Sequence, residues 1–270
     1  MQAAKLEEIA IGILNTNNVN IRDVGGKVKP FPYTTGNQGP IYLGIKALVG
    51  FPGILKILTR ELASEIHSRG INFDFIVGNA LGGMVPGWQI RDDLSLLYGR
   101  EFPFCYRSKE GELTGNENNP AIERRAKALI FDELVDYAHT TVESAKTCRE
   151  KGYTVTDGVC LVSYNNPEGI ENLRDNGINH VSLITLTKIL DVACERGYFE
   201  PKLIASAREF LANPVRWQLI RNLPIPHSSV EKAAGLGYKM RQLTPKEAVV
   251  FGAPRKKVEE GKVYWIEDKE

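Results

Sequence analysis

The sequence alternates between short apolar runs and helix-length amphipathic segments, and this pattern constrains the fold more than any other feature. Residues 84–97, 140–151 and 170–176 have the periodicity of helices. The runs expected to form strands lie at residues 73–77, 102–106, 128–131, 159–163 and 180–184. Strands separated by helix-length connections need crossovers and are therefore expected to be parallel. The sequence predicts an α/β fold with a central, mostly parallel sheet flanked by helices on both faces.

The segment before this alternation predicts two further helices. Residues 6–14 and 52–67 have an apolar face, and Pro52 and Gly70 suit the start and the end of the second helix. Residues 24–39 are rich in Gly, Pro and Thr and are expected to contain little regular structure.

The pattern changes beyond residue 190. A helix at 203–211 is followed by several prolines and a strand-like run at 262–266. We therefore divide the chain into a first domain, 1–195, and a C-terminal extension or small subdomain, 196–270. Whether this extension is a second domain, a lid or a partner-binding tail stays open.

Composition excludes several classes of protein. With 34 basic and 33 acidic residues the formal net charge is +1, so a generally polycationic nucleic-acid binder is excluded, although a local basic patch is possible. No apolar run approaches the ~18 residues of a membrane span. The amino terminus carries acids where a signal peptide needs basic residues, and we expect a cytoplasmic protein.

The four cysteines indicate neither disulfides nor a metal site. Cys105, Cys148, Cys160 and Cys194 lie in apolar or helical stretches, without a Cys-x-x-Cys pair or a histidine at ligand spacing. We expect reduced thiols that act as small hydrophobic residues, and no metal site made of protein side chains.

Residues 128–145 carry the strongest chemical signal. They read Ala-Leu-Ile-Phe-Asp-Glu-Leu-Val-Asp-Tyr-Ala-His-Thr-Thr-Val-Glu-Ser-Ala, so an apolar strand runs into Asp132 and Glu133 and a helix opens at Thr140 and Thr141. Acids at a strand end suit ligand hydroxyls, and free N–H groups at a helix start suit phosphate. The pattern indicates a site for a ribose phosphate. The alternative is that the acids only end a strand and Thr140 only caps a helix.

This segment resembles the type I phosphoribosyltransferases, whose signature is an apolar strand, two acids, two apolar residues and a phosphate loop. The chain is most similar to the orotate phosphoribosyltransferases. Residues 31–42 hold Thr-Gly and Gly-Pro-Ile-Tyr where those enzymes have Ser-Gly and Ser-Pro-x-Tyr. Residues 76–86, Ile-Val-Gly-Asn-Ala-Leu-Gly-Gly-Met-Val-Pro, match the family's pyrophosphate turn. Residues 161–173 occupy the place where the orotate enzymes carry an acidic-basic pair before a Glu-Gly.

The resemblance implies an enzyme that moves a 5-phosphoribosyl group from phosphoribosyl diphosphate, with Mg2+, to a ring nitrogen of a nucleobase. The base would be orotate or another base, pyrophosphate would be released, and pyrimidine biosynthesis would be the setting. It also implies a homodimer.

The resemblance assigns roles to individual residues. Asp132 and Glu133 would hold the ribose hydroxyls, and Arg107 and Lys109 would stabilise the departing charge. The phosphate loop would consist of Asp136, Tyr137, Ala138, His139, Thr140 and Thr141. The glycine turn that binds pyrophosphate would consist of Gly78, Asn79, Ala80, Leu81, Gly82 and Gly83.

The phosphate loop departs from the family pattern because both of its glycines are missing. Ala138 and His139 restrict the positive φ angles that such loops use. Asp136 places a carboxylate near a phosphate, although the hypoxanthine-guanine branch has an Asp at this place, where it accepts a proton from the base. We therefore count Asp136 among the catalytic candidates, together with Arg107 and Lys109.

The catalytic loop departs as well. Glu112 and Thr114 stand where the orotate enzymes have a second Lys and a His. An anion in place of a cation reverses the Coulomb interaction with pyrophosphate. For an active enzyme we predict that Arg124 or Lys127 points toward the glycine turn and supplies the missing charge.

The base site lacks the Arg with which the orotate enzymes bind a carboxylate. Residues 163–166 read Ser-Tyr-Asn-Asn, and Tyr164, Asn165 and Asn166 can hydrogen-bond a base. Lys46 offers a positive charge from another segment.

We expect the remaining histidines, His67, His180 and His227, to be structural. Trp88 is expected in the core, and Trp217 and Trp265 are expected to anchor the core of the C-terminal extension. Residues 255–257, Arg-Lys-Lys, are expected to be a solvated turn.

Three functional hypotheses remain. The first is the phosphoribosyltransferase. The second is a catalytically eroded protein of the same fold that binds a nucleotide or phosphoribosyl diphosphate as a sensor or subunit. The third is a regulator that contacts RNA through a basic tail, and the absence of an aromatic-interleaved basic stripe argues against nucleic acid as a partner.

Overall fold

The computed structural model describes residues 3–25, 28–33, 35–244, 247 and 263–266. The chain forms two compact units, one from Met1–Asn18 and Gly44–Ala193 and one from Val19–Leu43 and Cys194–Glu270. The division at residues 195 and 196 stays a prediction. Residues 255–257 lie outside the described residues.

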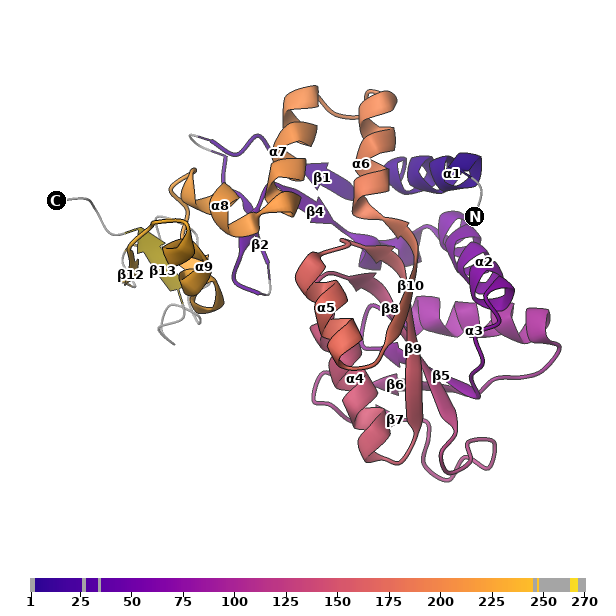
Figure 1. The fold of residues 1–270 in the computed structure, drawn as a ribbon. Coiled ribbons are helices and arrows are strands. Elements are labelled where there is room, and N and C mark those ends of the chain that lie inside the picture. Colours follow the sequence, from indigo (N-terminus) through magenta and orange to yellow (C-terminus); the bar gives the residue numbers. More distant parts are fainter. Residues whose placement is uncertain (1–2, 26–27, 34, 245–246, 248–262, 267–270) are drawn as a thin grey trace. The chain divides into compact units, whose positions relative to one another are not determined.

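The first unit contains a six-stranded sheet of order β10-β9-β8-β5-β6-β7 (Figure 1). β5, β6, β8, β9 and β10 pair in parallel, as predicted, and β7 pairs antiparallel to β6. The strands are β5 (Phe75–Asn79), β6 (Phe104–Arg107), β7 (Leu113–Thr114), β8 (Lys127–Val135), β9 (Thr154–Ser163) and β10 (Asn179–Thr185). The two-residue β7 was not predicted, because the polar stretch around it has no apolar alternation.

Helices cover both faces of this sheet. They are α1 (Ala3–Leu14), α2 (Pro52–Ser68), α3 (Met84–Tyr98), α4 (His139–Glu150), α5 (Pro167–Asp175) and α6 (Leu186–Glu195), with a 3-10 helix, η1, at Ile45–Gly50. The connection through α3 leads from β5 to β6, whereas α4 and α5 lead in the opposite direction, from β8 through β9 to β10. Right-handed crossovers therefore place α3 on the face opposite α4 and α5.

The strand containing the acid pair is longer than predicted. The predicted strand ended at Phe131, but β8 continues through Asp132 and Glu133 to Val135. Its carboxyl half keeps its pairing with β9, up to Val135 opposite Ser163, while its pairing with β5 stops at Phe131. The acids therefore lie on the part of β8 that pairs with β9 but no longer with β5.

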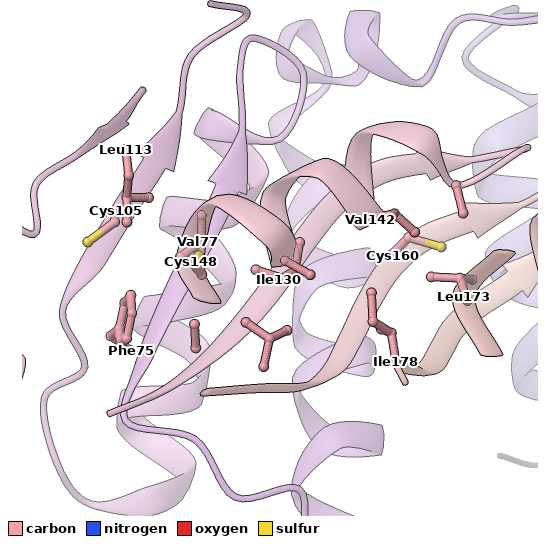
Figure 2. Packing of buried hydrophobic residues seen from close by; sticks show 14 of the residues in the cluster. Phe75, Val77, Cys105, Leu113, Ile130, Val142, Cys148, Cys160, Leu173 and Ile178 are labelled. Carbon is pink, nitrogen blue, oxygen red and sulfur yellow. The ribbon is translucent and has the colours of Figure 1, made fainter. Parts of the chain in front are cut away.

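The core between the sheet and its α4–α5 face is apolar and contains three of the four cysteines. Figure 2 shows Val142 and Leu173, from α4 and α5, on either side of Cys160 from β9. Burial raises the pKa of the thiols of Cys105 and Cys148 to about 12, so both stay neutral. All four cysteines are free, as expected, and Cys194 is exposed.

In its described part, the second unit contains three small sheets and three α-helices. Its paired strands are β1 (Val19–Ile21) with β4 (Ile41–Leu43), β2 (Phe31–Pro32) with β3 (Gln38–Gly39), and β11 (Ile225–Pro226) and β12 (Met240–Gln242) with β13 (Val263–Ile266). Its helices are α7 (Pro201–Ala212), α8 (Pro214–Leu219) and α9 (Val230–Gly235), with a 3-10 turn, η2, at His227–Ser229. The predicted helix at 203–211 and the predicted strand at 262–266 are confirmed.

Of the two tryptophans expected to anchor the second unit, Trp217 is confirmed in a buried position, whereas Trp265 is only partly buried. Trp217 is buried, and its indole Nε1 donates a hydrogen bond to Ser206 Oγ. Trp265 packs under the guanidinium of Arg241 and donates to Asn222. The buried Gln218 accepts a hydrogen bond from the backbone N–H of Gln38 and so holds the 31–42 segment onto α8.

No helix within the described ranges is both long enough and apolar enough to span a membrane.

His180, at the start of β10, couples the stability of the sheet to pH. Burial lowers the pKa of its imidazole to about 4, and its Nε2 has no hydrogen-bond partner among the described atoms. Between pH 6.5 and 4 the unfolded chain binds a proton that the folded chain excludes, so folding free energy is lost as pH falls. We expect the free energy of unfolding, measured in urea, to fall between pH 7 and pH 4 by up to about 3 kcal/mol less in His180→Leu than in the wild type. Equal losses would show that His180 is protonated inside the fold.

Candidate functional site

The candidate site lies where the order of the sheet reverses. β5 and β8 are neighbours, but α3 leaves β5 on one face and α4 leaves β8 on the other. Ligands of open α/β sheets bind at such switch points, outside the carboxyl ends of the strands. Gly78 pairs with Phe131, so Asn79 at the end of β5 lies beside Asp132 on β8.

A buried chain of hydrogen bonds links three elements at this point. Asn79 Nδ2 donates to Asp132 Oδ2 over 2.8 Å. Asn79 Oδ1 accepts a hydrogen bond from the hydroxyl of Ser144 on α4. All three side chains are buried. The chain therefore connects β5, β8 and α4 where the predicted ribose, pyrophosphate and phosphate sites meet.

The two acids of β8 contact different parts of the site. Asp132 faces Asn79, whereas Glu133 faces the glycine turn. Lys46 Nζ lies 3.5 Å from Glu133 Oε1, but the Lys46 side chain is 71% exposed and that of Glu133 only 7%. An exposed lysine screens a buried carboxylate only in part.

The environment of Asp132 disfavours its charge. Burial raises the pKa of this carboxyl well above its usual value, and the negative charge of Glu133 raises it further. Hydrogen bonds from Asn79 and from the Glu133 N–H act in the opposite direction and are weaker. A ligand that brings hydroxyl donors or positive charge to this carboxyl would relieve the cost.

The glycine turn has close contacts, with the Glu133 side chain at Gly82 and with backbone at Gly83, that leave no room for further side chains. A β-carbon on Gly82 would lie 2.0 Å from Glu133 Oε1, and one on Gly83 would lie 2.9 Å from Asn79 N. The Gly83 N–H donates to Asn79 O over 2.8 Å, and the Ala80–Leu81 peptide bond is cis. The turn thus packs directly against the acid pair, with Leu81 67% exposed.

The phosphate loop ends at an uncapped helix start. Ala138 precedes α4 with φ 60° and provides no side-chain cap. The first hydrogen bond inside the helix runs from the Val142 N–H to Ala138 O, so the N–H groups of residues 139–141 are available to an anion. The helix begins at His139 rather than at Thr140, and Ala138 takes the positive φ that the sequence was expected to restrict.

The side chains of the phosphate loop differ in exposure. His139 and Thr140 are exposed, while Thr141 is buried and its hydroxyl has no partner among the described atoms. The rings of Tyr137 and His139 lie parallel, 6.1 Å apart. Burial raises the pKa of the Asp136 carboxyl, against a hydrogen bond from Asn166.

Arg107 and Lys109, the cations of the catalytic loop, lie at the carboxyl end of β6, at the same edge of the sheet as the site. Arg107 already has a hydrogen-bond partner. Arg107 ends β6 opposite Asn79, and its Nε donates to Thr147 Oγ1 on α4 over 3.0 Å. Lys109 is exposed in the turn that follows. The Tyr164 N–H donates to Val135 O, which places Tyr164 beside the end of β8.

The expectation that Arg124 or Lys127 points toward the glycine turn is wrong. Lys127 is the first residue of β8, and its N–H donates to Asp74 Oδ2 just before β5 begins. Arg124 lies three residues earlier. A strand rises about 3.3 Å per residue, so Lys127 is roughly 26 Å from the end of β8. Both residues belong to the amino edge of the sheet, opposite the site.

The expectation that Trp88 lies in the core is also wrong. Trp88 is 53% exposed, because α3 packs on the sheet with the face that carries Gly87 and Ile90. It borders a groove of about 620 Å³ on the α2–α3 side of the unit. We call this the apolar groove, and its lining includes Val49, Leu55, Met84, Val85, Trp88 and Phe104.

Sequence reasoning missed Ser144 and Asn172, and it expected Asn166 at the base rather than at the phosphate loop. Ser144 holds Asn79, and Asn166 and Asn172 contact the phosphate loop from the start and the middle of α5. Ser144 shows in the sequence only as a serine on the inner face of a helix, which is a common signal without functional meaning. Within the described ranges no group of three or more His, Cys, Asp or Glu residues is placed to hold a metal ion.

Comparison with solved structures agrees with this fold, which is that of the type I phosphoribosyltransferases. The chain superimposes on the UMP synthase of Leishmania donovani with a TM-score of 0.64 and 22% identity, over 78% of this chain and 42% of that longer chain. The orotate phosphoribosyltransferase of Francisella tularensis superimposes with a TM-score of 0.56 and 16% identity over 75% of this chain and 96% of its own.

The chain is also similar in sequence to the orotate phosphoribosyltransferases, which confirms the resemblance. The enzyme of that name from Coxiella burnetii is 27% identical over 213 residues, 78% of this chain and 97% of the relative. No family model matches the chain.

The contact between Gly82 and Glu133 predicts a sharp effect of one methyl group. We expect Gly82→Ala to weaken binding of phosphoribosyl diphosphate at least tenfold in calorimetry, because the methyl overlaps the Glu133 carboxylate. Gly53→Ala on α2, where nothing lies within 4 Å of the new carbon, is the control and should bind as the wild type does. Equal binding by both variants would show that the glycine turn does not contact the ligand.

Proposed function

We propose that this protein transfers a 5-phosphoribosyl group from phosphoribosyl diphosphate to a nucleobase and releases pyrophosphate. One observation carries the proposal: the buried chain Asp132–Asn79–Ser144 joins the acid pair, the glycine turn and the uncapped start of α4 at the switch point of the sheet. A ribose that carries phosphate at one end and diphosphate at the other needs these three environments together.

Different residues of the site bind different parts of phosphoribosyl diphosphate, the donor. Asp132 and Glu133 accept hydrogen bonds from the ribose hydroxyls, and the N–H groups of residues 139–141 bind the 5-phosphate. The turn of residues 78–83 binds the diphosphate through the N–H groups of Leu81 and Gly82, because those of Ala80 and Gly83 already donate to Arg107 O and Asn79 O.

Mg2+ fits the donor set of this site. The carboxylates of Asp132 and Glu133 are adjacent, and the exposed Lys46, which pairs with Glu133, screens their charge only in part. Mg2+ prefers one or two carboxylates completed by substrate phosphate oxygens. Asp132 and Glu133 would hold the ion together with the diphosphate. When bound, Mg2+ supplies positive charge to the diphosphate.

Loss of diphosphate leaves positive charge on the ribose carbon, so the protein acts mainly through charge and exclusion of water. Lys109 and Arg107 stabilise the departing pyrophosphate, provided that Arg107 exchanges its bond to Thr147 for one to the ligand. Asp136, whose pKa is raised by burial, accepts the proton of the incoming base.

The relatives named orotate phosphoribosyltransferase favour orotate as the base and pyrimidine biosynthesis as the setting. Tyr164 and Lys46 are the residues we assign to base recognition. Another base stays open, since residues 163–166 contain no arginine to bind a carboxylate. The setting we propose is the cytoplasm.

A second candidate function is binding of a nucleotide or of phosphoribosyl diphosphate without turnover. It is favoured by the bond that ties Arg107 to α4 and by the position of Arg124 and Lys127 at the far edge of the sheet. Glu112 and Thr114 in the catalytic loop agree with it.

Calorimetry separates the two functions. The wild type is titrated with phosphoribosyl diphosphate and Mg2+, and then with orotate, uracil, hypoxanthine and adenine in turn, while released pyrophosphate is assayed. We expect turnover with one base. Binding of the donor without turnover with any base would establish the binding protein instead.

The acid pair provides the matching variant. We expect Asp132→Asn with Glu133→Gln to weaken donor binding at least tenfold, about 1.4 kcal/mol, because both ribose contacts are lost. Unchanged affinity in a folded double variant would place the donor site elsewhere.

We also propose a homodimer that forms through the apolar groove. Val85 and Trp88 are 55% and 53% exposed, and an apolar face of this kind marks an interaction surface. We expect Val85→Asp to shift sedimentation toward the monomer. Leu96→Asp, on the same helix, 81% exposed and outside the groove lining, is the control. A wild type that sediments as a monomer at micromolar concentration would contradict the dimer.

A further inference from the structure

The phosphate loop holds a conformation that its own residues do not favour. Ala138 has φ 60° and ψ 13°, in the left-handed region, where the β-carbon of L residues is crowded. Glycine would adopt this conformation without penalty, and the loop contains none. Contacts from outside the loop must therefore stabilise it.

The first contact comes from the start of α5. Asn166 caps this helix, since its Oδ1 accepts the Glu168 N–H over 3.0 Å. The Nδ2 of the same side chain donates to Asp136 Oδ1 over 2.9 Å. Because the cap fixes the amide, the loop aspartate is tied to the geometry of the helix start.

The second contact lies further along α5 and acts on the loop backbone. Asn172 Nδ2 donates to Tyr137 O over 3.1 Å. Asn176 Nδ2 donates to Asn172 Oδ1, which turns the Asn172 amide so that its N–H faces the loop. The Tyr137 carbonyl belongs to the peptide unit whose orientation sets φ of Ala138, so this bond acts on the strained torsion.

The third contact is backbone on backbone. A β-carbon on Gly169 of α5 would lie 2.0 Å from Asp136 O. No side chain fits between the helix and the loop at this point, and the contact leaves the loop little room to relax toward α5.

From these three contacts we infer that α5 preorganises the phosphate loop, with Asn166 and Asn172 as positioning residues that replace the missing glycines. They hold Ala138 in the left-handed conformation, which keeps the N–H groups of residues 139–141 directed at one anion. The inference rests on the proposed function, since it assigns the anion to the phosphate end of the donor. It makes α5, which follows β9, a part of the phosphate site.

The experiment measures binding of ribose 5-phosphate by calorimetry, without turnover. We expect Asn172→Ala to weaken binding about fivefold to tenfold, because Ala138 then relaxes. Adding Ala138→Gly to this variant should recover at least threefold, since glycine adopts the required φ freely. The same exchange in the wild-type background should gain less. A role in stability alone would show no such rescue.

Controls keep the outcome unambiguous. Ile170→Ala, an exposed position on the same helix, should bind as the wild type does. Asn166→Ser retains a good helix cap but loses the bond to Asp136, and it should weaken binding if Asn172→Ala does not fold. Wild-type affinity in the asparagine variants, or loss without rescue, overturns the inference while the proposed function stands. A wild type that binds neither ribose 5-phosphate nor the diphosphate donor overturns both.

Discussion

The hydrogen bond between Asn79 and Asp132 is the interaction on which the site depends. It joins the end of β5 to β8 at the point where the order of the strands reverses, and Ser144 extends the hydrogen-bonded chain to α4. Buried polar groups are costly when unpaired, so this chain has one low-energy arrangement. That arrangement sets the position of the glycine turn relative to the acid pair, and of both relative to the start of α4.

Charge is the second constraint. The carboxyls of Asp132 and Glu133 are adjacent on β8, and burial, the negative charge of Glu133 and the interaction with its side chain raise the pKa of Asp132. The protein therefore carries an unfavourable charge arrangement that stability alone would not retain. Such an arrangement is typical of sites that bind cations or hydroxyl donors, where function offsets a loss of stability.

Much of this could be predicted from the sequence, and the failures have identifiable causes. The five parallel strands and the position of Asp132 and Glu133 at the carboxyl edge follow from periodicity, because apolar runs and helix-length spacers allow few topologies. The side of α3 on which Trp88 lies could not be predicted, since α3 carries apolar residues on more than one face. The position of Lys127 at the amino edge of the sheet could not be predicted either, because the long polar loop before β8 does not show where this strand begins.

The sequence by itself determined the fold class, the positions of the five parallel strands and the residue types of the site, because these depend on local periodicity and on chain connectivity. Only the tertiary structure decided how Ala138 reaches a left-handed conformation, which cations face the acid pair, and that α5 contacts the phosphate loop. These depend on contacts such as those of Asn166 and Asn172, which lie 30 and 35 residues from their partners. No local pattern encodes such distances, since they arise only when the sheet brings β8 and α5 together.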